Sequence, residues 1–459
     1  MKLLKTSLAV LVGAALLTGC NDETIIEVQK EAQVTDVKFA TFNLSFDRYT
    51  LEELIEELQV EPSRQTELVT AYLDGTIGED DKTMAERIVQ IRNVAAIIQK
   101  NRPNVVMLAE FNNDGTGEDM SGLIGFQENY LSIPQSTDGA GGEPNLEPIE
   151  FPFMESYATN TGLASGHDLD RNGSDGTELG GDAWGFGMYH GQYAFALMSQ
   201  YEIDKDNTRT FQEFLWKDLD GATNPTITVC DGSEFIPEGL ACGDNWYTDE
   251  QWEEVRLSSK NHVDAPVLIP TGDGEFETVH LLMSHPTPPV FDPGKNQQMN
   301  SAEVEFWQHY VNDAEFLYDD AGVKGGLDAG KHFVIMGDLN LERWSGDGIL
   351  QTMEDLHNDP LLNQEVMNGE LYPISYGAAE HAVDASIDHP LPNRMTSTFG
   401  LGVDYAMPSA TMNVKDTGVY WSATYEEGRK LFNDDRIGQY GDGKSISSDH
   451  RMVWIEAQF

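Results

Sequence analysis

The sequence runs Phe333-Val334-Ile335-Met336-Gly337-Asp338-Leu339-Asn340 through residues 333–340. Four apolar residues ahead of a polar end predict a buried strand. Because side chains alternate along a strand, we expect Asp338 and Asn340 on one face, where one could bind a metal ion and the other orient substrate or water. Gly-Asp-x-Asn is also a common turn sequence, so the stretch alone leaves a simple turn open.

Two further segments place polar side chains beside predicted strands. The apolar run 105–108 leads to Glu110, and hard cations such as Mg²⁺ prefer carboxylate oxygens. Asp449 and His450 precede a predicted strand at 452–455. An aspartate can hold a metal ion while a neighbouring imidazole takes a proton from water near neutral pH. Adjacent side chains diverge on an extended chain, so we predict a bend at Asp449-His450.

The remaining pattern predicts a layered α/β (α+β) protein. With 40% hydrophobic residues, the chain of 459 residues has ample material for a core. Capping-box spacing at Thr50/Glu53 and Thr83/Glu86 predicts helices near 51–72 and 84–100. Further elements are expected as follows: strands at 37–43, 193–198 and 281–285, a helix at 300–318, long loops over 111–190, and little regular structure over 202–275. Scattered strands with few helices between them favour two stacked sheets flanked by helices over a doubly wound nucleotide-binding fold.

Six segments in order resemble the endonuclease/exonuclease/phosphatase superfamily: Phe42-Asn43, Ala109-Glu110, Ser284-His285, Gly337-Asp338-Leu339-Asn340, Val403-Asp404-Tyr405 and Ser448-Asp449-His450. The resemblance implies a four-layer α/β/β/α sandwich with long loop insertions, formed by one catalytic domain over residues 36–459. It also implies hydrolysis of phosphomonoesters or phosphodiesters with Mg²⁺ or Mn²⁺, at a site along the sheet edges.

The resemblance also assigns roles to individual residues. Glu110, supported by Asn43, corresponds to the principal metal site, and Asp449 lies beside the metal. The chemistry it implies is in-line attack of water on phosphorus.

The remaining roles concern the nucleophile and the phosphate. Asp338 and Asn340 would orient them, and His450, held by Asp404, would be the general base. His285 would donate hydrogen bonds to the phosphoryl oxygens.

Two observations weigh against a nucleic-acid substrate. Some nucleases of the superfamily carry a glutamate that orients the first histidine, just before the strand equivalent to 192–199, whereas this chain has His190 and Gly191 there. The net charge of −50 also repels polyanions. Small phosphoesters are therefore favoured over nucleic acid. The acidity is also typical of adaptation to a salty medium, in which case it says nothing about substrate. An extracellular nuclease and a noncatalytic surface-binding lipoprotein stay as alternatives.

Two other groups of residues could bind ions. Asp168, Asp170 and Asn172 have the spacing of a calcium loop, but its twelfth position is Leu179, with Glu178 one place early. A complete helix-loop-helix calcium site is not expected, and a structural Ca²⁺ that orders the loop is a hypothesis. Arg256 and Lys260 are rare cations here that could bind a substrate phosphate, although pairing with nearby acids is an equal alternative.

The N-terminus predicts an exported lipoprotein. Lys2 and Lys5 precede an apolar run at 8–17, which is too short to span a bilayer and typical of a secretory signal. Leu17-Thr18-Gly19-Cys20 resembles a bacterial lipobox, which implies cleavage after residue 19 and acylation of Cys20. Residues 20–35 would form a tether, and Asn21 favours the outer membrane, with the domain facing the periplasm or the exterior. The lipid anchor would be the sole membrane contact.

The remaining cysteines, Cys230 and Cys242, lie close together in a loop-like stretch. In an oxidising compartment such a pair predicts a structural disulfide.

Overall fold

The computed structural model describes residues 35–173, 180–272, 274–437 and 446–459. The predicted signal sequence, Cys20 and nearly all of the predicted tether lie outside these residues. In the described part, no helix is both long and apolar enough to cross a bilayer.

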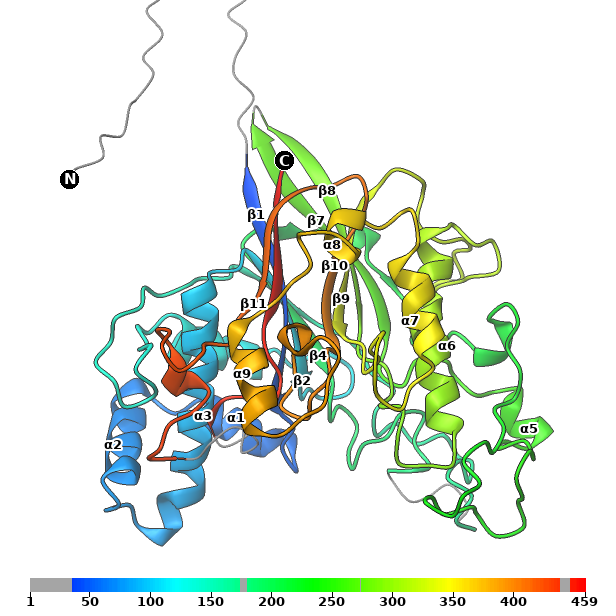
Figure 1. The fold of residues 1–459 in the computed structure, drawn as a ribbon, viewed down its shortest axis with the longest axis horizontal. Helices are drawn as coiled ribbons and strands as arrows, with labels where there is room; N and C mark the ends of the chain where they lie inside the picture. The colour runs from blue at the N-terminus through cyan, green and yellow to red at the C-terminus, as the bar shows by residue number, and fades with distance from the viewer. Residues whose placement is uncertain (1–34, 174–179, 273, 438–445) are drawn as a thin grey trace, which may run out of the picture. The chain divides into compact units, whose positions relative to one another are not determined.

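Twelve strands form two mixed sheets in this part of the chain (Figure 1). The first has the order β11-β12-β1-β2-β4-β3, with bounds β1 Asp36–Phe46, β2 Val105–Phe111, β3 Phe153–Ser156, β4 Phe195–Ser199, β11 Asn413–Val419 and β12 Val453–Gln458. The second has the order β10-β9-β8-β7-β5, with β6 also paired to β7; its bounds are β5 Glu202–Ile203, β6 Arg209–Thr210, β7 His262–Gly272, β8 Glu275–Ser284, β9 His332–Asp338 and β10 Asp404–Pro408.

Helices cover the outer faces of the two sheets (Figure 1). The first sheet is flanked by α1 Leu51–Leu58, α2 Pro62–Leu73 and α3 Glu79–Asn101, and the second by α6 Lys295–Val311 and α7 Leu350–His357. Further helices lie in the connections: α4 Ser121–Phe126, α5 Asp249–Trp252, α8 Gln364–Met367, α9 Tyr376–Asp384, a π-helix at Gln127–Leu131, and 3-10 helices at Lys205–Asn207, Trp216–Asp218, Pro392–Arg394 and Arg429–Leu431. The predicted stack of two mixed sheets between helices is confirmed.

The core follows the alternation of β1. Val37 and Phe39 belong to the cluster between the sheets, whereas Ala40 and Phe42 belong to the cluster under α1, α2 and α3. Asn43 has the same parity as Val37 and Phe39, so its side chain points toward the second sheet. This parity positions the site described below.

The predicted helix at 51–72 is two helices. Thr50 caps α1 as expected, by accepting a hydrogen bond from the Glu53 N–H at 3.2 Å. Pro62 then begins α2, with the preceding Glu61 extended at ψ 140°. Proline lacks an N–H and disfavours helical backbone in the residue before it, so one continuous helix cannot pass this point.

Two other helix boundaries also differ from the prediction. Helix α3 begins at Glu79 rather than at residue 84, because three acidic residues occupy its first turn and are stabilised by the helix dipole. Helix α6 spans Lys295–Val311 rather than 300–318. The Asp292 carboxylate accepts the Asn296 N–H at 3.0 Å in its first turn, and the left-handed backbone of Asp313, with φ 53°, follows its end.

The prediction of little regular structure at 202–275 is wrong for β7, which lies inside the second sheet. The strand contains Pro266 and Pro270, and proline ordinarily argues against an internal strand because it cannot donate to the ladder. Antiparallel pairing with β8, the next strand in the chain, nevertheless holds β7 in the sheet, from His262 opposite Ser284 to Gly272 opposite Glu275.

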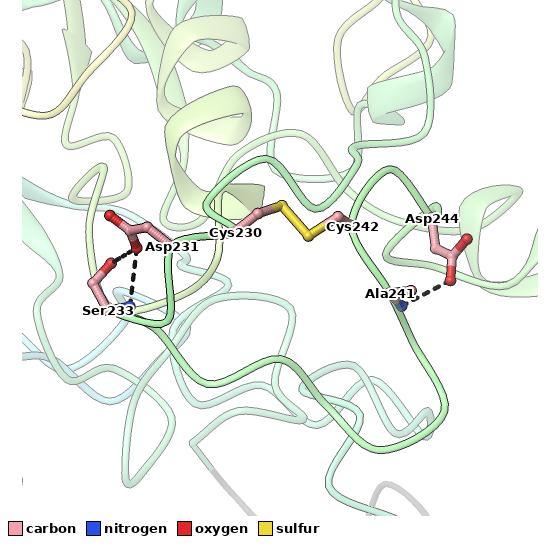
Figure 2. Close-up of a disulfide and its surroundings, with 6 residues drawn as sticks. All are labelled: Cys230, Asp231, Ser233, Ala241, Cys242 and Asp244. Atoms are coloured by element: carbon pink, nitrogen blue, oxygen red, sulfur yellow. Dashed lines mark hydrogen bonds between the residues drawn. A yellow bond between two sulfur atoms is a disulfide. The ribbon is translucent and has the colours of Figure 1, made fainter.

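A disulfide joins Cys230 and Cys242, whose Cα atoms are 6.0 Å apart (Figure 2). Local turns flank both ends. Asp231 accepts the Ser233 N–H at 2.9 Å, and Asp244 accepts the Ala241 N–H at 2.8 Å.

Candidate active site

The sequence-predicted catalytic residues and the three predicted metal residues gather where strands of the two sheets end. Asn43 and Glu110 lie near the ends of the parallel strands β1 and β2, and Asp338 ends β9. Asp404 begins β10, directly opposite Asp338 in the antiparallel pair. His450 precedes β12, which pairs antiparallel with β1. Strand polarity therefore brings residues from distant parts of the sequence to the same edge.

Asn43 connects the two sheets at this edge. Its Nδ2 atom donates to Glu110 Oε1 at 3.1 Å and to Asp338 Oδ2 at 3.0 Å. Its Oδ1 atom accepts the Ser45 N–H at 3.0 Å. Asn43 therefore positions two carboxylates, and in this structure it supports the predicted metal site through hydrogen bonds.

Glu110 reaches Asn43 only because the alternation of side chains along β2 is broken at Glu110. Along β2, Met107 and Ala109 face the space between the sheets, and Leu108 faces the helices. Regular alternation would turn Glu110 toward the helices as well. Instead Glu110 has φ 54° and Phe111 lies in the helix-side cluster, at a shift in the β1–β2 register. Such an irregularity is common beside active sites, where it redirects a side chain.

His450 and Asp404 form a buried pair beside Asp338. His450 Nδ1 lies 2.9 Å from Asp404 Oδ2, and Nε2 lies 3.7 Å from Asp338 Oδ2. The Thr396 hydroxyl donates to Asp404 Oδ2 at 2.7 Å. Ligand atoms of Asp338, Asp404 and His450 lie within 4.8 Å of one another, so the group could hold a metal ion. Because Asp404 already pairs with the imidazole, we interpret the group first as a proton-transfer network.

The charges of this network depend on one another. Burial raises the pKa of Asp404 to about 6, against the opposing effect of His450. Burial disfavours the charged form of His450, but the carboxylates of Asp404 and Asp338 outweigh it and raise the His450 pKa well above its ordinary value. Asp338 is also buried, yet His450 and His285 hold its pKa well below the ordinary value. Asp338 is therefore ionised at neutral pH.

His285 and Lys260 approach the same carboxylate from the second sheet. His285 Nε2 lies 3.5 Å from Asp338 Oδ2. Its Nδ1 atom is buried with no hydrogen-bond partner among the described residues, in keeping with the missing glutamate noted in the sequence. Burial, and next the charge of Lys260, lower the pKa of His285 to about 4. His285 is therefore neutral at pH 7.

Lys260 is a buried cation at this site. Its side chain lies within the fold, with Nζ 3.5 Å from the Pro286 carbonyl oxygen. Burial lowers the pKa of Lys260, and Glu303, Asp338 and Glu110 counteract that effect. Of the two predicted phosphate ligands, Lys260 is thus close enough to interact electrostatically with the carboxylates of the site.

Arg256 is engaged elsewhere. Its guanidinium donates to Asn160 Oδ1 at 2.8 Å and to Glu213 Oε1 at 3.2 Å, and it lies over the Trp184 ring. These contacts fit a structural role. Its predicted role in binding phosphate stays a prediction.

Asn340 lies beside Asp338 for a different reason than strand alternation. Strand β9 ends at Asp338, and Asn340 has left-handed backbone with φ 51°. Its N–H donates to Asp338 Oδ1 at 3.0 Å, and its side-chain amide donates to the Pro286 carbonyl at 3.1 Å. The turn geometry, rather than a shared strand face, brings the two residues together.

Asp449 is held next to β1. The chain bends at Asp449, as predicted, and the Ser45 hydroxyl donates to its carboxylate. The Ser448 hydroxyl donates to the Asn43 carbonyl at 2.7 Å. Glu110 and Asp449 are thus two partly buried carboxylates. Both receive hydrogen bonds from β1, Glu110 from Asn43 and Asp449 from Ser45. These hard oxygen ligands fit Mg²⁺ or Mn²⁺, which bind through one or two carboxylates and retain water for substrate to displace.

Several supporting residues escaped the sequence analysis. Ser45, Thr396 and Glu303 are buried polar residues that hold the site. Glu303 accepts the backbone N–H groups of Ser259 at 2.7 Å and Thr287 at 2.6 Å, and so fixes the segments that carry Lys260 and His285. Polar residues of this kind give no local signal, because their partners are remote in sequence.

Comparison with known proteins identifies a family. The model of the endonuclease/exonuclease/phosphatase family matches residues 40–450. No curated protein matches the chain.

Solved structures similar to this chain include three bacterial proteins of that family. The protein from Beutenbergia cavernae is 15% identical with a TM-score of 0.43, over 92% of this chain and 72% of that one. The protein from Leptotrichia buccalis is 11% identical with a TM-score of 0.40, over 92% and 100%. The protein from Bacteroides thetaiotaomicron is 10% identical with a TM-score of 0.38, over 94% and 97%. On the family match across residues 40–450, this chain belongs to the endonuclease/exonuclease/phosphatase family.

Proposed function

We propose that this protein hydrolyses small phosphoesters, as monoesters or diesters, outside the cytoplasm with the help of a divalent cation. Members of its family are hydrolases of phosphoester bonds that use divalent metals. The observation that carries the proposal is the His450–Asp404 pair, whose free ring nitrogen lies beside Asp338.

The side chains have distinct tasks in this reaction. Asp404 fixes the imidazole of His450 through Nδ1, and Nε2 accepts a proton from the attacking water in the neutral form of the ring, which becomes populated as the pH rises toward the raised pKa of His450. Asp338 and Asn340 orient that water and the phosphate. His285, with its neutral ring, donates to a phosphoryl oxygen, and Lys260 adds a positive charge as negative charge grows there.

Glu110 and Asp449 would hold the cation. A divalent ion bound by these carboxylates would neutralise charge on the phosphoryl group during attack. Asn43 keeps Glu110 in place for that purpose through the hydrogen bond of 3.1 Å.

Charge supports a small substrate. The net charge of −50 disfavours long polyanions, whereas one phosphate needs only a local cation. Lys260 and the bound metal would supply that local charge.

A substrate panel tests the reaction. Purified protein is assayed on phosphomonoesters and phosphodiesters with Mg²⁺, Mn²⁺ or Ca²⁺, together with His450→Ala and Asp449→Ala. We expect metal-dependent turnover that falls by about 10² to 10⁴ in His450→Ala. His280→Gln is the matched control, because His280 Nδ1 also pairs with an aspartate, Asp264, at 2.8 Å but lies about 13 Å back along β8 from Ser284.

The same panel separates the alternatives. Degradation of plasmid DNA at low protein concentration, lost in His450→Ala, would favour a nuclease. If the panel shows no turnover that depends on Asp449, as judged by its loss in Asp449→Ala, a noncatalytic binding protein is favoured.

We also propose export and anchoring through Cys20, with the outer membrane as destination. The lipobox-like segment Leu17-Thr18-Gly19-Cys20 supports this. The native protein should partition into detergent and Cys20→Ala into water; equal partitioning of the two would contradict the anchor.

A further inference from the structure

Three carboxylates outside the candidate active site converge in the long connection between β3 and β4. Asp168, Asp170 and Asp182 each place one oxygen within 4.8 Å of the other two. Asp182 is a third carboxylate that the calcium-loop spacing did not include; Leu179, at the twelfth loop position, and Glu178 lie outside the described part of the chain.

These three carboxylates outnumber the positive charge near them, where Lys295 interacts electrostatically with Asp170. Over the described residues, none of them pairs with a lysine, arginine or histidine. Close carboxylates repel one another at short range, and the net charge of −50 adds to the repulsion. A bound cation would supply the missing charge.

Asp182 gives independent support for a ligand. Its side chain is only 1% exposed. One oxygen, Oδ1, accepts the Leu169 N–H at 2.9 Å, but Oδ2 is buried without a hydrogen-bond partner among the described residues. A buried carboxylate oxygen without a partner is costly unless something else satisfies it.

The backbone around the cluster leaves room for the carboxylates. A Cβ atom on Gly181 would lie 2.1 Å from Asp170 Oδ2, so glycine is needed for Asp170 to approach Asp182. The N–H groups of Asn172 and Gly173 donate to Asp168 at 3.0 and 3.1 Å and fix its orientation.

We propose that Asp168, Asp170 and Asp182 bind a structural Ca²⁺ ion. The ligands are all oxygens, and Ca²⁺ accepts six to eight oxygen ligands in flexible geometry, whereas Mg²⁺ requires near-octahedral geometry and keeps its water. Loop carbonyls and water can complete such a shell.

The proposed ion would stabilise a connection that contacts the segment carrying Lys260. The Leu169 carbonyl accepts the Trp246 indole N–H, and the Asp168 carbonyl accepts the Gln251 amide, both at 2.8 Å. Farther along the same connection, Gly185 lies so close to Ser259 that an added Cβ would be 1.7 Å from the Ser259 carbonyl oxygen. Because Ser259 directly precedes Lys260, a well-ordered loop would help to position Lys260, the proposed phosphate ligand.

Calcium titration of the purified, chelator-treated protein tests this inference. To remove binding at the active site, calorimetry with Ca²⁺ alone uses the double variant Glu110→Gln/Asp449→Asn. We expect one Ca²⁺ per chain and a higher melting temperature. Adding Asp182→Asn should weaken binding at least about tenfold, while keeping the Oδ1 acceptor for the Leu169 N–H.

Two further variants make the outcome decisive. Asp168→Asn should weaken Ca²⁺ binding in the same way, so the test does not depend on one variant folding. Asp231→Asn, in the disulfide loop, is the matched control and should bind as its parent does. Lack of Ca²⁺ binding at millimolar concentration, or equal affinity with and without Asp182→Asn and Asp168→Asn, would overturn the proposal. The site does not rest on the proposed hydrolase activity, so inactivity in the panel would leave it standing.

Discussion

At the scale of single residues, the two predicted phosphate ligands separate clearly. Lys260 is a buried cation near Asp338, His285 and Glu110. The Arg256 guanidinium donates hydrogen bonds to Asn160 and Glu213. Both residues look alike in the sequence, as rare cations in an acidic chain, and only their surroundings distinguish them.

We predict that Lys260→Met lowers kcat/KM for a phosphoester by about 10² to 10³, because a fixed charge at the developing phosphoryl charge is lost. Arg256→Met, the matched control, should reduce stability but change kcat/KM by less than about tenfold. Steady-state kinetics with melting curves measures both effects. Equal kinetic losses in the two variants would refute the distinction.

At the scale of elements, contacts between loops and strands decide the site more than local propensity does. The long connection between β3 and β4 touches the segment before β7 at Gly185 and Ser259. Glycine is required because no side chain fits at this close approach.

We predict that Gly185→Ala destabilises the protein by roughly 2 kcal/mol, since the added methyl group must push the connection away from Ser259. Gly78→Ser is the control, because nothing lies within 4 Å of a Cβ at Gly78 and serine is a good N-cap for α3. Urea unfolding should show a loss only for Gly185→Ala. If the urea midpoint of Gly185→Ala equals that of the wild type, the close approach of Gly185 to Ser259 does not limit stability.

At the scale of the whole molecule, buried neutral histidines make stability depend on pH. Burial lowers the pKa of His357 to about 4, and also those of His262 and His285. The unfolded chain binds protons near pH 6.5, whereas the folded protein resists them until about pH 4. The stability contributed by these three histidines is therefore complete above pH 6.5 and falls as the pH drops toward 4.

We predict that His357 alone accounts for about 2 kcal/mol of the stability lost between pH 8 and pH 5. His357→Phe should cost about 1 kcal/mol at pH 8, because the hydrogen bond of Nδ1 to the Met353 carbonyl is lost. In exchange, its unfolding free energy should vary less with pH. Urea unfolding at both pH values gives the comparison, and an unchanged pH dependence would exclude His357 as a source.

The sequence by itself determined the two-sheet fold, the family, and the segments that lie at the candidate active site, because apolar strand patterns and the polar residues beside them are local. The break at Pro62 and the hairpin of β7 with β8 are also local features, which hydrophobic periodicity overlooked. Tertiary structure alone decided the inward turn of Glu110. It also brought Asp182 beside Asp168 and Asp170. These features depend on pairing between remote segments and on positive φ at single residues, which hydrophobic periodicity does not encode.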